Sequence, residues 1–131
     1  MILTDEDTHV LREAAPEAEA LGRLAPAQLK LIERHDWFRL LAPRSLGGAQ
    51  LPLPQAVRLE EAIAEADGSC GWVVTLCAGA GWFAAFLPPT LAREVVATPG
   101  MCLAGSGAAT GVAEREGDGW RIAGRWAHAT G

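Results

Sequence analysis

The sequence predicts an α+β chain, with an N-terminal helical bundle over residues 1–99 and the beginning of an antiparallel β domain over residues 100–131. Apolar residues recur at helical spacing as far as Val96. Beyond Pro99-Gly100, bulky and polar residues alternate instead, which is the spacing of a strand. The Asp118-Gly119 pair between two such segments is the strongest short-range signal for a hairpin turn.

The composition describes a folded domain with no affinity for nucleic acid. The chain has 131 residues, of which 50% are hydrophobic and 21% charged, enough for one domain with its own core. The net charge is -5 and the basic residues are scattered, so nothing would neutralise phosphates. The three cysteines lack the CxxC spacing of metal sites, and an odd number is no disulfide framework. The N-terminus lacks the basic start of a signal peptide, so we expect a cytoplasmic protein with free thiols.

Three helices are predicted in the first half. Thr4 or Asp5 caps the first helix, and Pro16 should kink or interrupt it. A proline in the first-turn position starts the second helix, over residues 26–36. The third follows Pro54, with apolar residues on one side and four carboxylates on the other.

The fourth predicted helix belongs to an uncharged segment. No charged residue occurs between Gly68 and Ala92, and residues 70–87 reach the length of a membrane span. However, the segment is rich in Gly, Ala, Thr and Cys, lacks flanking basic clusters and lies between acidic amphipathic helices. We therefore expect no membrane span but a helix at the centre of the bundle, which is also apolar on all sides. It ends at Pro88-Pro89, and a fifth short helix covers residues 90–96.

The β part should consist of a hairpin and an extended continuation. The strands are predicted at residues 111–115 and 120–123, the second half-buried, and residues 125–130 resume the extended pattern. Alternation would put Trp126, His128 and Thr130 on one face. No further strand follows to cover the open edge, and a short ribbon alone is marginal in water, so we expect the front part of a larger fold.

Four segments follow one another along the chain: LLAPRSLGGAQLPL (40–53), LEEAIAEADGSCGWV (59–73), LAGSGAATGVAER (103–115) and GDGWRIAGRWAHATG (117–131). In this order they resemble the acyl-CoA dehydrogenase superfamily, and within it most closely the flavin-dependent monooxygenase branch. Trp126 favours that branch, because the dehydrogenases often carry Lys there. The resemblance spans the chain but only the front of the family's architecture, which implies an N-terminal fragment that is inactive alone.

The resemblance implies a cofactor, FAD or FMN, and four residues beside it. Ser106 and Thr110 lie in a loop of small residues, where hydroxyls and backbone amides would meet the flavin. Thr130 occupies a position that hydrogen-bonds the flavin ring, and His128 replaces a Trp or Phe that packs on it. From the residues alone, the loop is more simply a strand-to-strand turn that needs its glycines, and an exposed strand histidine is the alternative for His128.

One further residue is a candidate for a substrate pocket. Trp82 lies on the uncharged helix that borders the substrate cavity in the family, although it could also be a packed core aromatic. His9 and His35 stand beside charged residues on amphipathic helices and lack partners with metal-ligand spacing, so we predict no metal site.

The leading functional expectation is a flavin-dependent oxidoreductase of the monooxygenase kind that acts on a small apolar or aromatic substrate. A partner reductase would supply reduced flavin, and the parent protein would be a homo-oligomer. One alternative is an acyl-CoA dehydrogenase proper, acting on an acyl thioester, but no carboxylate here matches its general base and no catalytic residue is assigned. Another is a non-catalytic helical interaction module. The chain alone should bind flavin weakly or not at all, because it encodes only one wall of the site and tight binding needs a largely enclosed ligand.

Overall fold

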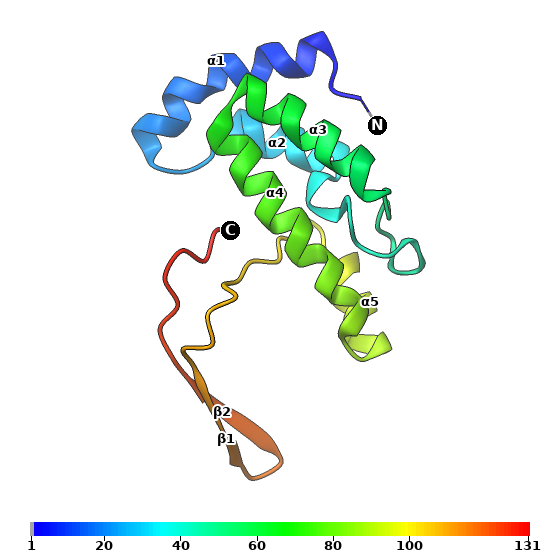
Figure 1. Cartoon of the computed structure of the whole chain (residues 1–131), viewed down its shortest axis with the longest axis vertical. Coiled ribbons are helices and arrows are strands. Elements are labelled where there is room, and N and C mark those ends of the chain that lie inside the picture. The colour runs from blue at the N-terminus through cyan, green and yellow to red at the C-terminus, as the bar shows by residue number, and fades with distance from the viewer. Residues whose placement is uncertain (1) are drawn as a thin grey trace.

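A computed structural model describes residues 2–131 as a helical bundle from which a β-hairpin projects (Figure 1). The structure confirms the predicted α+β class and the order of five helices followed by two antiparallel strands. The helices are α1 (Asp5–Leu21), α2 (Pro26–His35), α3 (Leu53–Ala66), α4 (Gly68–Trp82) and α5 (Pro89–Ala97), and the strands are β1 (Val112–Glu116) and β2 (Gly119–Ala123). Short 3-10 turns occupy Trp37–Arg39, Arg44–Leu46 and Phe83–Phe86.

Helix α1 is capped as predicted but is not interrupted. The Thr4 hydroxyl accepts a hydrogen bond from the Asp7 backbone N–H at 3.1 Å, and the Asp7 carboxylate accepts one from the Thr4 backbone at 3.1 Å. Pro16 lies inside the helix, which continues to Leu21, so the predicted interruption is wrong. The buried residues Ala14 and Ala18 hold the turns on both sides of Pro16 against the bundle, and this packing outweighs the missing backbone bond.

Prolines mark the starts of the next two long helices. Helix α2 begins at Pro26 as predicted, whereas α3 begins at Leu53, before the predicted start at Pro54. A proline in the first turn costs no hydrogen bond, because the N–H groups there have no partner within the helix. Pro54 is therefore accommodated within α3.

The core lies where α1, α2, α3 and α4 meet. Cys70, Val74 and Ala78 form the inward face of α4 and are fully buried. Gly71 allows α4 to approach α3 closely, since a Cβ there would lie 2.6 Å from the Ala64 Cβ. The main cluster of buried residues comprises Leu11, Leu31, Ile32, Trp37, Leu40, Leu59, Ile63, Cys70, Val74 and Ala78.

Within residues 2–131, one helical stretch, Gly68–Phe86, is long and apolar enough to cross a membrane by length and composition. A helix at the centre of a bundle passes the same test. In the structure 39% of the stretch is buried, and its inward face packs into the core. The opposite face, which carries Trp72 and Trp82, is exposed, so α4 is enclosed on one face and not on all sides, as the expected central helix would be.

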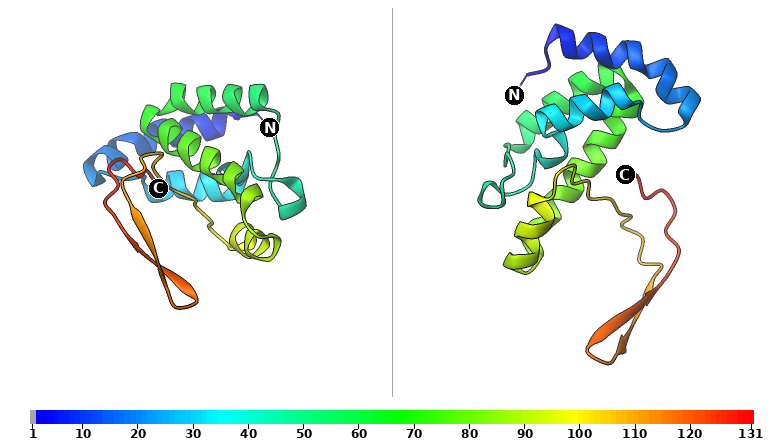
Figure 2. Two further views of the ribbon diagram at one scale, coloured as in Figure 1. Left: turned by 60° about the horizontal axis from the view of Figure 1, so that its bottom comes forward. Right: turned by 180° about the vertical axis from the view of Figure 1, so that it is seen from behind.

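The hairpin stands away from the helices (Figures 1 and 2). Its register pairs Val112 with Ala123 and Glu116 with Gly119, and every residue of both strands is exposed. The expected half-burial of residues 120–123 is therefore wrong: Trp120 is 63% exposed, because within residues 2–131 nothing covers either face of the ribbon.

The stretch after β2 is not a strand. Residues 124–131 have no regular secondary structure, and His128 has a φ of 57° in the left-handed region. One left-handed residue ends the two-residue alternation of side chains. The predicted single face shared by Trp126, His128 and Thr130 is consequently absent from the structure.

Candidate functional site

Two irregular segments connect the hairpin with the helices, and we call them the outgoing leg (residues 101–111) and the returning leg (residues 124–131). The Thr110 hydroxyl donates to the Arg125 carbonyl at 2.8 Å, joining the legs near the hairpin. The Trp126 ring covers Gly111 and Gly124, where a Cβ at either position would overlap it. Gly131 reaches Ala104 at the other end. The legs therefore meet near the hairpin and again beside α4 (Figure 2).

Thr130 joins the returning leg to α4. The Trp72 indole N–H donates to the Thr130 hydroxyl at 3.4 Å, and the Cys77 thiol donates to the Thr130 carbonyl with a sulfur–oxygen distance of 3.8 Å. Trp72 and Cys77 are far apart along the chain from Thr130, so only the tertiary fold brings these groups together.

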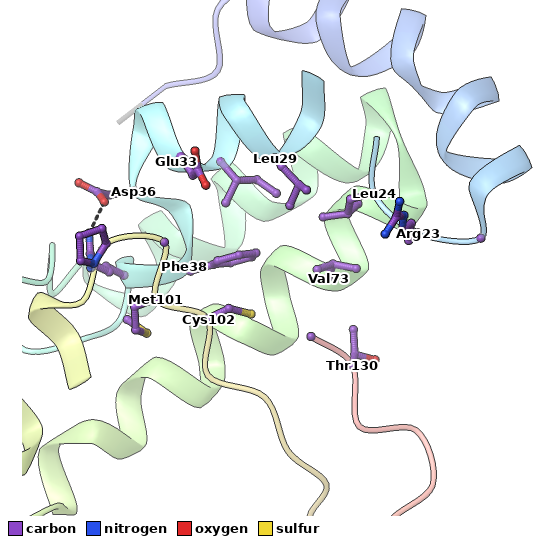
Figure 3. Close-up of a pocket in the computed structure, with 16 residues that line it drawn as sticks. Arg23, Leu24, Leu29, Glu33, Asp36, Phe38, Val73, Met101, Cys102 and Thr130 are labelled. Atoms are coloured by element: carbon purple, nitrogen blue, oxygen red, sulfur yellow. Dashed lines mark hydrogen bonds and ion pairs between the residues drawn. The ribbon is translucent and has the colours of Figure 1, made fainter. Parts of the chain in front are cut away.

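Thr130 also lies at the edge of a cavity of about 760 Å³. Figure 3 shows Thr130 on the opposite side of this cavity from Leu29 and Glu33 of α2. The volume suits a ligand of drug or cofactor size. The lining is mostly apolar and comprises Gly22, Arg23, Leu24, Leu29, Ile32, Glu33, Asp36, Phe38, Arg39, Val73, Pro99, Gly100, Met101, Cys102, Thr130 and Gly131.

The charged group best placed at the cavity, Arg39, is held by protein partners. Its guanidinium forms an ion pair with Asp36 at 2.5 Å. It also donates to the backbone carbonyls of Val96 at 3.0 Å and Thr98 at 2.8 Å. Arg39 therefore fixes the end of α5, which leads into the outgoing leg. Through this contact it also positions residues 99–102, which line the cavity.

The structure brings one of the four predicted flavin residues to the cavity. Thr130 lines it, whereas Ser106, Thr110 and His128 lie farther along the legs. The Ser106 hydroxyl accepts from the Ala108 backbone N–H at 3.3 Å, and Thr110 bonds across the legs. His128 is exposed. The contacts of these four residues with flavin stay predictions.

Trp82 lies at the end of α4, outside the lining of this cavity. It packs edge-on against Phe83, with ring centroids 5.3 Å apart, and against Phe86 at 5.1 Å. Trp82 is 51% exposed, and both phenylalanines are more exposed. It is therefore neither a packed core aromatic nor part of the cavity described here, and its contact with substrate stays a prediction.

Sequence reasoning missed most of the cavity wall. Three residues of the wall are not among the site residues that the sequence predicts: Phe38, Val73 and Cys102. Cys102 directly precedes segment 103–115, which carries part of the family resemblance. This position is the one feature of the sequence that indicates a place for Cys102 near the site. Within residues 2–131, no three His, Cys, Asp or Glu side chains gather as metal ligands would.

The chain is similar in sequence to oxygenase components of flavin-dependent monooxygenases, although no family model matches it. It is 28% identical over 123 residues to the oxygenase component of an FADH(2)-dependent resorcinol hydroxylase from Rhizobium sp. (strain MTP-10005), covering 93% of this chain and 30% of that protein. It is 30% identical over 122 residues to the flavin-dependent monooxygenase oxygenase subunit HsaA from Rhodococcus jostii (strain RHA1), covering 92% of this chain and 32% of the subunit. The chain thus spans about a third of the length of these curated relatives.

Two solved structures match the fold. A 3-HSA hydroxylase from Rhodococcus sp. RHA1 superposes with a TM-score of 0.85 and 28% identity over 95% of this chain and 33% of its own. XiaF from Streptomyces sp., in complex with FADH2 and glycerol, superposes with a TM-score of 0.89 and 28% identity over 96% of this chain and 32% of its own. The resemblance drawn from the sequence is confirmed: the chain is homologous to the N-terminal third of flavin-dependent monooxygenase oxygenase components of the acyl-CoA dehydrogenase-like family.

Proposed function

We propose that this chain forms the N-terminal part of the oxygenase component of a flavin-dependent monooxygenase. In this proposal it contributes one wall of a site for FADH2 and a small apolar or aromatic substrate. The main support is the match to XiaF, a structure that contains FADH2, at a TM-score of 0.89 over 96% of this chain. Because the chain spans about a third of XiaF, activity would require the remainder of such a protein.

The proposed role of Thr130 follows from its hydrogen bonds. Its hydroxyl oxygen accepts from Trp72, so its own hydrogen is free to be donated to an acceptor atom of the flavin. The Cys77 thiol meanwhile holds the Thr130 carbonyl. Thr130 is therefore held at its hydroxyl and at its carbonyl by two side chains of one helix, and a residue already held in place loses little entropy when a ligand binds.

The rest of the chain would shape the site. Ser106, Thr110 and His128 are the proposed contacts along the legs, and Gly105 and Gly107 let the backbone approach the ligand closely. The apolar cavity wall would exclude water and orient an apolar substrate. A bound reduced flavin supplies electrons and the chemistry of oxygen activation.

A separate reductase is the proposed source of FADH2. The resorcinol hydroxylase relative is an oxygenase component and is FADH(2)-dependent, which implies a second component that reduces the flavin. FADH2 is favoured over FMN because it is the form named for this relative and for XiaF.

A chimera would test the proposal. This chain replaces the matching N-terminal third of XiaF, and FADH2 binding is measured without oxygen by titration calorimetry. We expect stoichiometric binding by the chimera and weak or no binding by the 131-residue chain alone. Thr130→Ala should weaken binding about fivefold, the equivalent of one hydrogen bond of about 1 kcal/mol. Thr90→Ala, at an exposed position in the first turn of α5, is the matched control and should leave affinity unchanged.

Activity assays separate the competing functions. The chimera is supplied with NADH, FAD and a flavin reductase, and is offered phenols, indoles and acyl thioesters. Oxygen-dependent hydroxylation of an aromatic substrate supports the monooxygenase, and desaturation of a thioester supports a dehydrogenase instead. A folded chimera that fails to bind FADH2 would contradict both the monooxygenase and the dehydrogenase function. The remaining alternative would then be a non-catalytic helical interaction module.

A further inference from the structure

Two cysteines from distant parts of the chain meet beside the cavity. The sulfurs of Cys77, on α4, and Cys102, on the outgoing leg, lie 3.4 Å apart, and both thiols are free. Cys77 is fully buried, whereas Cys102 is exposed and lines the cavity. The third cysteine, Cys70, is fully buried in the main core cluster. The chain therefore contains one close thiol pair, and Cys70, which lies in the core, serves as a control cysteine.

The pair is placed for bond formation. Disulfide sulfurs lie about 2.0 Å apart, so closing the pair requires an approach of about 1.4 Å. Cys77 is fixed within a helix, but Cys102 belongs to a segment without regular secondary structure, two residues after Gly100 with its positive φ of 66°. A small shift of the outgoing leg towards α4 would bring the sulfurs into bonding distance.

We propose that Cys77 and Cys102 form a reversible disulfide when the protein meets a peroxide, and that this bond ties the outgoing leg to α4 at the edge of the cavity. The site depends only on these residues and goes beyond the proposed monooxygenase function.

The chemistry begins at the exposed thiol. The Cys102 thiolate attacks one oxygen of hydrogen peroxide, the O–O bond breaks, and the products are a sulfenic acid and hydroxide. The Cys77 sulfur then attacks the Cys102 sulfur, the S–O bond breaks, and the departing hydroxide takes the Cys77 proton to form water. Overall two thiols lose two electrons and two protons, one peroxide is reduced, and two waters form.

Oxidation would change how the returning leg is held. In the reduced protein the Cys77 thiol donates to the Thr130 carbonyl, and Gly131 lies against the Cys102 sulfur. A disulfide has no S–H, so the bond to Thr130 would be lost while the outgoing leg gains a covalent attachment. Oxidation would therefore attach the outgoing leg covalently to α4 and leave the returning leg with the Trp72–Thr130 hydrogen bond to that helix.

The first test uses the full chain after complete reduction. Hydrogen peroxide is added at a stoichiometric amount, and the products are identified by mass spectrometry of peptides prepared without reductant. We expect a Cys77–Cys102 peptide pair that disappears on treatment with dithiothreitol. Cys70→Ser, the matched control on the same helix, should form this link to the same extent.

Two variants make the result decisive. Cys102→Ser changes an exposed residue, and the protein should no longer form an intramolecular link. Cys77→Ala should stop at a Cys102 sulfenic acid, which dimedone traps, and circular dichroism checks that this buried change leaves the protein folded. Should Cys77→Ala unfold, Cys102→Ser and the wild-type peptide map decide alone. A link through Cys70, a Cys102-linked dimer, or oxidation of Cys102 to sulfinic acid with Cys77 still free would each overturn the proposal.

Discussion

The side-chain amide of Gln28 donates a hydrogen bond to the carboxylate of Asp67, joining the first turn of α2 to the residue that caps α4. The Gln28 carbonyl oxygen accepts from the Ala25 backbone N–H at 2.9 Å. The other Asp67 oxygen accepts from the Ser69 backbone at 2.9 Å and from Cys70 at 3.4 Å. The pair of buried Gln28 and half-buried Asp67 thus caps two helices, one of which, α4, carries Trp72.

Asp67→Ala should destabilise the protein by about 3 kcal/mol. The change removes an N-cap, which costs about 1 kcal/mol, and leaves the fully buried Gln28 amide without its partner, which costs about 1–3 kcal/mol more. Urea denaturation followed by circular dichroism measures the difference. Glu61→Ala, on the exposed side of α3, should change the unfolding free energy by less than about 0.5 kcal/mol. Equal effects of the two changes would show that the pair contributes nothing.

Two glycines of α4 should respond to alanine in opposite directions. At Gly71 the added Cβ would lie 2.6 Å from the Ala64 Cβ and 2.7 Å from its Cα, so Gly71→Ala should cost about 1–3 kcal/mol through overpacking. At Gly79 nothing lies within 4 Å of an added Cβ, and Gly79→Ala should stabilise the helix by up to about 1 kcal/mol. Thermal unfolding of both variants checks the sign. Stabilisation by Gly71→Ala would mean that α3 and α4 are not packed as described.

Stability should fall in acid partly through Asp7. Burial raises the pKa of this carboxyl, but hydrogen bonds with Thr4 and the contact with His35, at 3.0 Å, outweigh burial and leave the pKa below its usual value of 3.8. The unfolded chain then binds more protons in this range, so the contribution is present above about pH 4 and is lost as the pH falls through the lowered value. The unfolding free energy of wild type should exceed that of Asp7→Asn at pH 6, and the gap should narrow towards pH 2. A gap that stays constant would contradict this.

The three thiols of the reduced native protein should react at very different rates. Cys102 is exposed, whereas burial raises the pKa of Cys70 and of Cys77 to about 12 and shields both sulfurs. With iodoacetamide at pH 8, which forms a thioether that the neighbouring Cys77 cannot displace, we expect one thiol to react quickly and two only on unfolding in guanidinium. Cys102→Ser should remove the fast phase and leave the slow one. A fast phase of two thiols would place Cys70 or Cys77 at the surface.

Much of the architecture could be predicted because its signals are local. The Thr4 cap, the proline at the start of α2 and the hairpin turn each act on neighbouring residues. The first two stand where predicted, and the turn lies one residue earlier than the Asp118-Gly119 pair, at Gly117 and Asp118, because Gly119 already pairs with Glu116. The family resemblance was likewise carried by short segments in order. Pro16 does not interrupt α1, because the buried Ala14 and Ala18 hold the turns on both sides of it. The start of α3 at Leu53 differs from the predicted one because a proline in the first turn, such as Pro54, costs no hydrogen bond.

The candidate site could be predicted only in part. The sequence by itself determined the helix order, the hairpin, the family and the candidate Thr130. Only the tertiary structure decided that Trp72 and Cys77 hold Thr130, that Cys102 lies against Cys77, and that the ribbon of β1 and β2 stands exposed. The physical reason is range: capping and turn preferences act over a few residues, whereas these contacts join residues 25 to 58 positions apart and form only when the helices pack.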